Sequence, residues 1–177
     1  QQGSTPNQII SWLVAHDVQN NPQSRQYGVV DYKNGSSRSA AFTGSSCYDY
    51  KNHILGPNYA IQGNILLGQQ ILDSMEYYFL NTSGCLPEKL MAAMNGAKVV
   101  GADTRCMVEG TSSLSSFLRM ALPTDSYNNL FLDINVAGTA PNVEPIDILE
   151  IKYNQWKNSH ISYCDSVLST EISKEND

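Results

Sequence analysis

Apolar residues recur every three or four positions in several stretches of the chain, which is the spacing of an amphipathic helix. The first stretch follows Thr5, whose hydroxyl can cap a helix, and Pro6, which fits the first helical position. This pattern predicts a helix that begins at Pro6 and ends near Val18. Further helices are predicted over residues 65–80, 87–95 and 145–157. The last of these has four candidates for burial: Ile146, Leu149, Ile151 and Trp156.

Short runs in which apolar residues alternate or follow one another predict strands. Residues 27–31 and 39–43 flank Asn34-Gly35, a dipeptide that favours a tight turn, so they predict a β-hairpin. Residues 44–58, rich in Gly, Ser and Tyr, predict a loop. Further strands are predicted over residues 59–63, 115–121 and 129–136. The order of these elements is typical of an α+β fold rather than of repeated βαβ units.

The composition fits one globular domain. The chain has 177 residues, 41% of them hydrophobic, which is enough for a sizeable core. We predict a single α+β domain over residues 1–158 and a polar tail or linker over residues 159–177. Charged residues make up only 16%, below the usual share of about 25%. Because uncharged polar residues must then build much of the surface, we expect a secreted or cell-surface protein.

The charge of the chain argues against two classes of partner. The formal net charge is −6, and Lys and Arg residues form no cluster. Nucleic acids and anionic membrane surfaces attract proteins through such clusters, so we expect neither as a partner. No apolar run is long enough to cross a bilayer, and we predict no membrane span.

The four cysteines are widely spaced, at Cys47, Cys85, Cys106 and Cys164. No pair has the C-x-x-C spacing of a zinc knuckle or a redox motif, and we predict neither a metal nor a cofactor. In a secreted protein the four could form two disulfides with three connectivities. In the cytosol they would instead be separate buried thiols. The sequence leaves these alternatives open.

Familiar catalytic motifs do not occur in the sequence, which has no G-x-S-x-G, P-loop, Rossmann glycine pattern or H-E-x-x-H. The three histidines, His16, His53 and His160, lie far apart along the chain. A catalytic triad assembles in space and is therefore not excluded, but nothing in the sequence favours one.

Polar residues set among strand residues and glycines mark the candidate site. Gln62, Gly63 and Asn64 stand where a predicted strand meets a helix, and donors there could form an oxyanion hole or bind an anion. The alternative is that Asn64 only caps the helix. Asp103 and Arg105 could be a charge pair that orients a reactive group, or a solvated loop pair of little energetic value.

These segments also resemble, in order, one protein family. The matching stretches are residues 25–31, Thr43-Gly44 with Cys47, residues 60–68, residues 101–105 and the strand at Ser115. Together they resemble DUF1028, a family predicted to be a secreted branch of the N-terminal-nucleophile hydrolases, over most of the chain. Within that family, the many Asn and Tyr residues look like those of secreted Bacteroidetes proteins.

The resemblance implies a four-layer αββα sandwich that hydrolyses C–N amide bonds. It implies a nucleophilic Thr, Ser or Cys at the mature N-terminus, where the free α-amine, with a pKa of about 8, acts as the general base. In this hypothesis the supporting catalytic residues are Thr43, Gln62, Gly63, Asn64, Asp103 and Arg105.

The sequence departs from the family at its start. Relatives carry a strand-rich segment with the nucleophile upstream of the helix at Thr5, and Ser4 and Thr5 do not replace that nucleophile because both are internal. We therefore expect the N-terminal strands and the nucleophile on an upstream segment or a companion chain, and a homo-oligomer remains open. The alternative function is a catalytically inert secreted module for binding or for a surface assembly.

Overall fold

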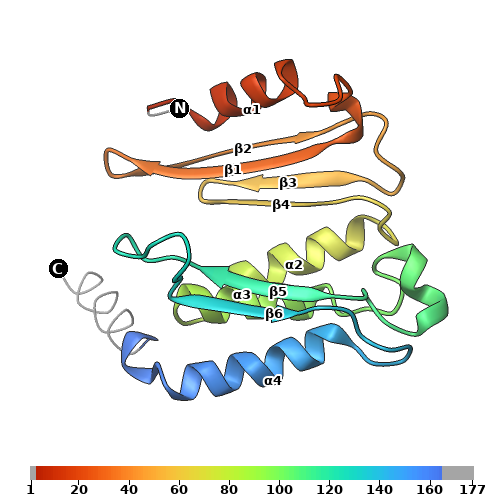
Figure 1. The fold of residues 1–177 in the computed structure, drawn as a ribbon, viewed down its shortest axis with the longest axis vertical. Helices are drawn as coiled ribbons and strands as arrows, with labels where there is room; N and C mark the ends of the chain where they lie inside the picture. Colours follow the sequence, from red (N-terminus) through yellow and green to blue (C-terminus); the bar gives the residue numbers. More distant parts are fainter. Residues whose placement is uncertain (1–2, 165–177) are drawn as a thin grey trace. The chain divides into compact units, whose positions relative to one another are not determined.

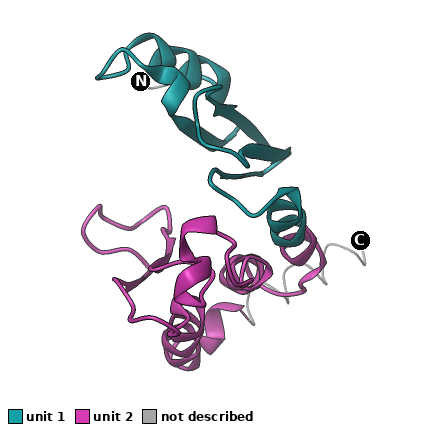
Figure 2. Cartoon of the chain, turned by 90° about the vertical axis from the view of Figure 1, so that its right-hand side faces the viewer, with its two compact units in different colours: residues 1–76 teal, residues 77–177 magenta. Residues whose placement is uncertain are grey.

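The computed structural model describes residues 3–164, and the chain falls into two compact units. Unit 1 comprises residues 1–76 and unit 2 residues 77–177, with the boundary inside helix α2 (Gln69–Asn81), as Figure 2 shows. Helices and antiparallel two-stranded sheets occur together, so the predicted α+β class is confirmed. The single domain over residues 1–158 stays a prediction.

Unit 1 opens with helix α1 (Pro6–Ala15), which starts with a capping box. The Thr5 hydroxyl accepts a hydrogen bond from the Gln8 N–H at 3.2 Å, and the Gln8 side chain accepts one from the Thr5 N–H at 2.8 Å. The helix was predicted to end near Val18 but stops earlier. It stops because the Asp17 carboxylate accepts hydrogen bonds from the backbone N–H groups of Gln19 and Asn21, which turns the chain.

The predicted hairpin is confirmed. Strands β1 (Gln26–Lys33) and β2 (Ser36–Thr43) pair antiparallel along their whole length. Asn34 and Gly35 form the turn with positive φ angles of 54° and 78°. Asn and Gly are the residues that tolerate this conformation, which explains why the dipeptide predicted the turn.

A second hairpin joins β3 (Asn52–Gly56) to β4 (Tyr59–Gly63). The strand predicted over residues 59–63 is confirmed, whereas the loop predicted over residues 44–58 contains β3. Only Ile54 and Leu55 are apolar among the non-glycine residues of β3, which is too few to show the period of a strand. Pairing with β4 therefore makes this strand, and its own sequence does not predict it.

The β1–β2 hairpin lies between α1 and the β3–β4 hairpin, so these elements form one helical layer and two strand layers (Figure 1). Gly28 on β1 permits a close approach, because a Cβ atom there would lie 2.7 Å from Gln62 Oε1 and 3.3 Å from the Cβ of Ala60. The Ser39 hydroxyl of β2 donates to the carbonyl oxygen of Gly56 at 2.5 Å. The two hairpins are thus in direct contact.

Helix α2 begins later than the predicted residue 65. The Ile65 N–H donates to the Tyr48 carbonyl oxygen at 3.1 Å, and Leu66 and Tyr50 exchange backbone hydrogen bonds of 3.0 and 3.3 Å. These bonds hold the segment in an extended pairing before the helix can start. Asn64 precedes this segment, so the alternative in which Asn64 only caps the helix is wrong.

Unit 2 is built around one apolar core. Helix α4 (Pro145–Asn158) packs on the hairpin of β5 (Ser116–Met120) and β6 (Leu132–Val136), and α3 (Leu86–Gly96) lies beside α4. Buried and exposed residues alternate along both strands. The core consists of Met91, Leu118, Met120, Leu132, Ile134, Val136, Ile146, Leu149 and Tyr153.

The predicted ends of these elements need two corrections. The strand predicted from residue 129 begins at Leu132, because the Asp125 carboxylate accepts the N–H groups of Leu122 and Phe131, both at 2.7 Å, and closes a loop. On α4, the prediction that Ile151 is buried is wrong, since its side chain faces solvent. The short 3-10 helices η1 (Pro22–Ser24) and η2 (Thr104–Glu109) were not predicted.

One disulfide links Cys85, at the start of α3, to Cys164, with 5.1 Å between their Cα atoms. Cys47 and Cys106 are buried free thiols. The structure therefore shows one disulfide and two free thiols, which is neither of the two alternatives that the sequence left open. Residues 161–164 of the predicted polar tail are helical, and the remainder of that tail lies outside the described residues.

The longest helix of residues 3–164 is α4, with 14 residues. Within this range, no helix has the length and the apolar character needed to span a membrane.

Candidate functional site

A single side chain, that of Gln26, joins three of the predicted site residues. Gln26 begins β1, and its Nε2 lies 3.0 Å from Thr43 Oγ1, 2.9 Å from the Gly63 carbonyl oxygen and 3.3 Å from the Asn52 carbonyl oxygen. Asn64 Nδ2 donates to Gln26 Oε1 at 2.9 Å. Thr43, Gly63 and Asn64 are thereby brought together from two different hairpins and the segment that follows them.

His53, which sequence reasoning did not single out, completes this network. Its Nδ1 lies 2.9 Å from Thr43 Oγ1. Because Thr43 Oγ1 accepts a hydrogen bond from Gln26, the hydroxyl can direct its own hydrogen to Nδ1 of a neutral imidazole. A hydroxyl donating to an imidazole is the arrangement in which histidine acts as a base. Together Gln26, Thr43, Asn52, His53, Gly63 and Asn64 form the Gln26 network.

A further set of hydrogen bonds supports Asn52. Its Nδ2 donates to Gln69 Oε1 at 2.8 Å, and its Oδ1 accepts the His53 N–H at 2.9 Å. Gln69 Oε1 also accepts from the Tyr50 hydroxyl at 2.7 Å, and its Nε2 donates to Asp73 at 2.7 Å. The side-chain amides of Asn52 and Gln69 each have a fixed orientation, because their donor and acceptor ends have different partners.

Gln62, the remaining predicted residue of this group, lies on the same face of the second hairpin as His53. The two residues are register partners on β4 and β3, so their side chains project to the same side, toward β1. Gln62 Oε1 is buried near Gly28 and has no hydrogen-bond partner among the described residues. It is therefore an unsatisfied acceptor in the layer between the hairpins.

Asp103 and Arg105 belong to unit 2 and do not join the Gln26 network. Asp103 caps η2 by accepting the Arg105 N–H at 3.0 Å, and the Arg105 guanidinium binds the same carboxylate at 2.6 Å. The side chain of Arg105 is 69% exposed. Hydrogen bonding from Arg105 lowers the pKa of the Asp103 carboxyl below its usual value. Of the two alternatives posed by the sequence, these contacts fit a local pair at the end of a loop.

One group of three side chains among residues 3–164 has the spacing of a metal site: Cys85, Glu88 and Cys164. Its two sulfur atoms are joined in the disulfide and are thus not free as thiolate ligands.

Unit 2 also contains a cavity of about 240 Å³ between α3 and α4. The residues lining it from α3 are Glu88, Met91, Ala92 and Asn95, and those from α4 are Glu150, Tyr153, Asn154 and Lys157. On each helix these positions follow the spacing i, i+3, i+4, i+7, so one face of each helix forms a wall. Sequence reasoning did not identify this cavity, because its walls come from segments far apart in the chain.

Comparisons with known proteins place the chain in a family. A family model described as "Family of unknown function (DUF1028)" matches residues 1–144. The crystal structure of protein SPO2555 from Silicibacter pomeroyi, itself described as DUF1028, superimposes with a TM-score of 0.66 at 22% sequence identity. That similarity covers 88% of this chain and 61% of the Silicibacter chain, and at this identity it bears on the fold alone. No curated protein matches the chain. The match over most of its length shows that the chain belongs to the DUF1028 family.

Proposed function

We propose that the chain is part of an amide hydrolase of the N-terminal-nucleophile type, with the Gln26 network as its supporting site. The observation that carries this proposal is the polar character of the layer between the two hairpins. Facing sheets normally pack through apolar side chains. Here Gln26, Thr43 and His53 are joined by hydrogen bonds of 2.9 and 3.0 Å instead. Ordered polar groups in place of a core are expected where chemistry requires them.

Asn64 is the proposed donor to the oxyanion that forms when an amide carbonyl is attacked. Its side chain is exposed, and one of its two amide hydrogens is directed to Gln26 Oε1. The second hydrogen remains for a substrate oxygen. Because Gln26 is itself held by Thr43 and the Gly63 carbonyl, it fixes the orientation of the Asn64 amide.

In this proposal the nucleophile is an N-terminal Thr, Ser or Cys on residues upstream of this chain, and its α-amine is the general base. Thr43 is internal to the chain, and its backbone nitrogen belongs to a strand rather than to a free amine. Thr43 and His53 are therefore positioning residues that fix the Gln26 amide from the side opposite Asn64.

The fold of the proposal is the four-layer αββα sandwich. It is supported by the order of α1, the first hairpin and the second hairpin as three successive layers, and by the likeness to a solved member of the family. The disulfide between Cys85 and Cys164 supports the proposal of a secreted or cell-surface protein, because disulfides persist in oxidising compartments.

The proposal can be tested with a β-lactone electrophile that acylates activated hydroxyl and thiol groups. The full-length protein is incubated with the probe, and the modified residue is located by intact mass and peptide mapping. We expect one acyl group on an N-terminal Thr, Ser or Cys upstream of residue 1 of this chain. Acylation of Thr43 would assign the nucleophile to the Gln26 network itself. If the probe acylates no residue and the protein hydrolyses no member of a peptide library, the hydrolase function is refuted.

The second candidate function is a catalytically inert binding module. A specific observation favours it: charged, polar and apolar side chains line the cavity between α3 and α4 together. This cavity belongs to unit 2, and its chemistry does not depend on the Gln26 network.

A further inference from the structure

The dipeptide Asn-Gly occurs twice in the chain, as Asn34-Gly35 and as Asn95-Gly96. It is chemically labile, because glycine has no side chain to keep its backbone nitrogen away from the asparagine side chain. This nitrogen can attack the side-chain carbonyl carbon of asparagine and close a cyclic succinimide. Since the attacking residue is glycine in both dipeptides, a difference between their reactivities must come from the fold.

Asn34-Gly35 forms the exposed turn of the first hairpin, at the end of unit 1 where β1 meets β2 (Figure 1). The last register pair of the two strands, Lys33 and Ser36, adjoins it. A Cβ atom placed on Gly35 would have no heavy atom within 4 Å, so open space surrounds the turn. The end of a hairpin frays readily because few contacts break. The Gly35 nitrogen therefore reaches the Asn34 side chain at little cost.

Asn95-Gly96 lies in the last turn of α3, and Gly96 is buried. Helical geometry directs the Gly96 N–H toward the preceding turn, away from the Asn95 side chain. The Asn95 amide is also bound to α4, since its Nδ2 donates to Glu150 Oε1 at 3.0 Å, and its Oδ1 is buried. The electrophile and the attacking nitrogen are thus both held in place.

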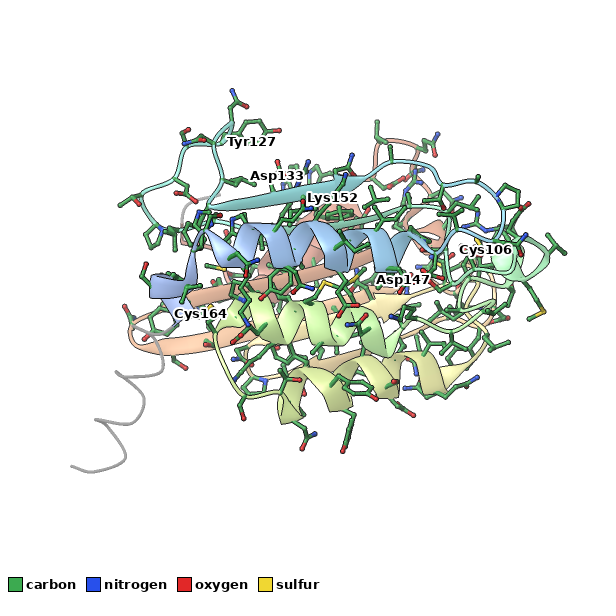
Figure 3. All side chains as sticks on the ribbon, turned by 90° about the horizontal axis from the view of Figure 1, so that it is seen from below. Cys106, Tyr127, Asp133, Asp147, Lys152 and Cys164 are labelled. Atoms are coloured by element: carbon green, nitrogen blue, oxygen red, sulfur yellow. A yellow bond between two sulfur atoms is a disulfide. The ribbon has the colours of Figure 1, made fainter. Side chains whose placement is uncertain are left out.

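The attachment of α3 to α4 extends to either side of Asn95. Just after α3, Lys98 binds Asp147 of α4 at 2.8 Å, and the two helices run side by side (Figure 3). Met91 of α3 and Leu149 of α4 belong to the same apolar core. For Asn95 to react, the end of α3 must unwind and leave this core, which costs more than the fraying of a turn.

From this contrast we propose that Asn34 is a site of spontaneous deamidation and isomerisation, and that the fold protects Asn95. The Gly35 nitrogen forms a bond to the side-chain carbonyl carbon of Asn34, and the amide nitrogen leaves as ammonia with the proton of the Gly35 N–H. Water then opens the succinimide at either of its carbonyl groups and gives aspartate or isoaspartate. This modification site goes beyond the proposed hydrolase function and does not require it.

Isoaspartate at position 34 alters the turn. The main chain then runs through the former side chain and is longer by one methylene group, so the turn with φ angles of 54° and 78° no longer fits. A carboxylate also adds one negative charge. Gln26 and Thr43 pair at the opposite end of the hairpin. The modification therefore loosens the tip of the hairpin and leaves the Gln26 network in place.

The test follows both dipeptides in the folded full chain at mildly alkaline pH, in water enriched in heavy oxygen, by peptide mass mapping. We expect Asn34 to convert about a hundredfold faster than Asn95, because Asn95 reacts only from an opened state. The product at Asn34 should carry heavy oxygen from the solvent. An isoaspartyl methyltransferase should label it, which distinguishes isoaspartate from the aspartate of direct hydrolysis.

The same chain in concentrated urea is the matched control. Both dipeptides are exposed there, and their rates should agree within about threefold. Asn34→Gly keeps a residue that tolerates the positive φ, so the protein should remain folded and lose most of its mass change. Equal rates at Asn34 and Asn95 in the folded chain would overturn the proposal. So would an Asn34 that converts in urea but stays intact in the folded chain, since the turn would then protect it.

Discussion

Different interactions stabilise the interior of each of the two units. In unit 2, α3 and α4 and the β5–β6 hairpin share a continuous apolar core, and a disulfide closes the chain around it. In unit 1, the two hairpins meet through an amide, a hydroxyl and an imidazole. Apolar burial stabilises a fold without requiring precise geometry. Hydrogen-bonded layers contribute less net stability and hold polar groups in defined orientations. We therefore expect unit 1 to be the better scaffold for chemistry and unit 2 to be the more stable structure.

The largest test of this difference is removal of the disulfide. We expect Cys85→Ser combined with Cys164→Ser to lower the free energy of unfolding by about 4 kcal/mol, because the bond closes a loop with a sequence separation of 79. Urea denaturation with tryptophan fluorescence measures the change. Cys106→Ser is the control for loss of a buried thiol. A double variant as stable as the parent would show that the bond does not form in the protein.

A smaller loss is expected from the apolar core itself. Leu149 is 0% exposed, and Leu149→Ala should lower the free energy of unfolding by about 3 kcal/mol through lost burial and the cavity that remains. Ile151→Ala is a matched control on the same helix, where 59% exposure predicts a change of under about 0.5 kcal/mol. Urea denaturation again provides the measurement. Equal losses for the two variants would contradict the described packing of α4.

In unit 1 the corresponding variant removes hydrogen bonds instead of apolar contacts. Gln26→Leu keeps a similar volume but leaves Thr43, Asn64 and the Gly63 carbonyl without their common partner. We expect a loss of about 2 kcal/mol, measured by urea denaturation. Gln155→Leu, at an exposed site on α4, is the control and should have almost no effect. An unchanged stability in Gln26→Leu would mean that the polar layer does not hold the hairpins together.

The sequence predicted those elements whose signals are local. Asn34-Gly35 gives the turn of the first hairpin by its own conformational preference, and Pro145 marks the start of α4. Strand β3 was missed because its pairing with β4, and not its own residues, makes it a strand. The start of α2 was placed too early for a similar reason, since Leu66 bonds to Tyr50 across a loop.

The candidate site shows the same limit. Thr43 and the Gln62–Asn64 turn were identified because they stand out locally as polar residues beside glycines. Gln26 and His53 were not, although Gln26 lies within a stretch that resembles the family. Gln26 reaches the Gly63 carbonyl across 37 residues of sequence, and this contact depends on how two hairpins pack against each other. No periodicity or motif encodes such a contact.

The smallest expected effect is a loss of stability of unit 1 at low pH. Backbone N–H donation from Asn21 and a hydrogen bond from Arg25 lower the pKa of the Asp17 carboxyl to about 2. A carboxyl with a lowered folded-state pKa stabilises the fold above its unfolded pKa of about 3.9, and this contribution is lost as the pH falls toward 2. Asp17 binds Arg25 just before β1, so its protonation loosens the connection between α1 and the first hairpin.

We therefore expect the stability of the parent chain to fall between about pH 4 and pH 2 by more than that of Asp17→Asn, which lacks the titrating group. Carboxyl NMR titration locates the Asp17 midpoint, and amide exchange of residues 17–25 measures the local loosening. Asp103→Asn is the comparison in unit 2. Its partner Arg105 is largely exposed, so solvent screens the pair and the acid effect there should be smaller. We expect this order because unit 1 relies on polar contacts, whereas unit 2 has an apolar core. A loss of stability in acid that depends on Asp103 as much as on Asp17, or more, would contradict it.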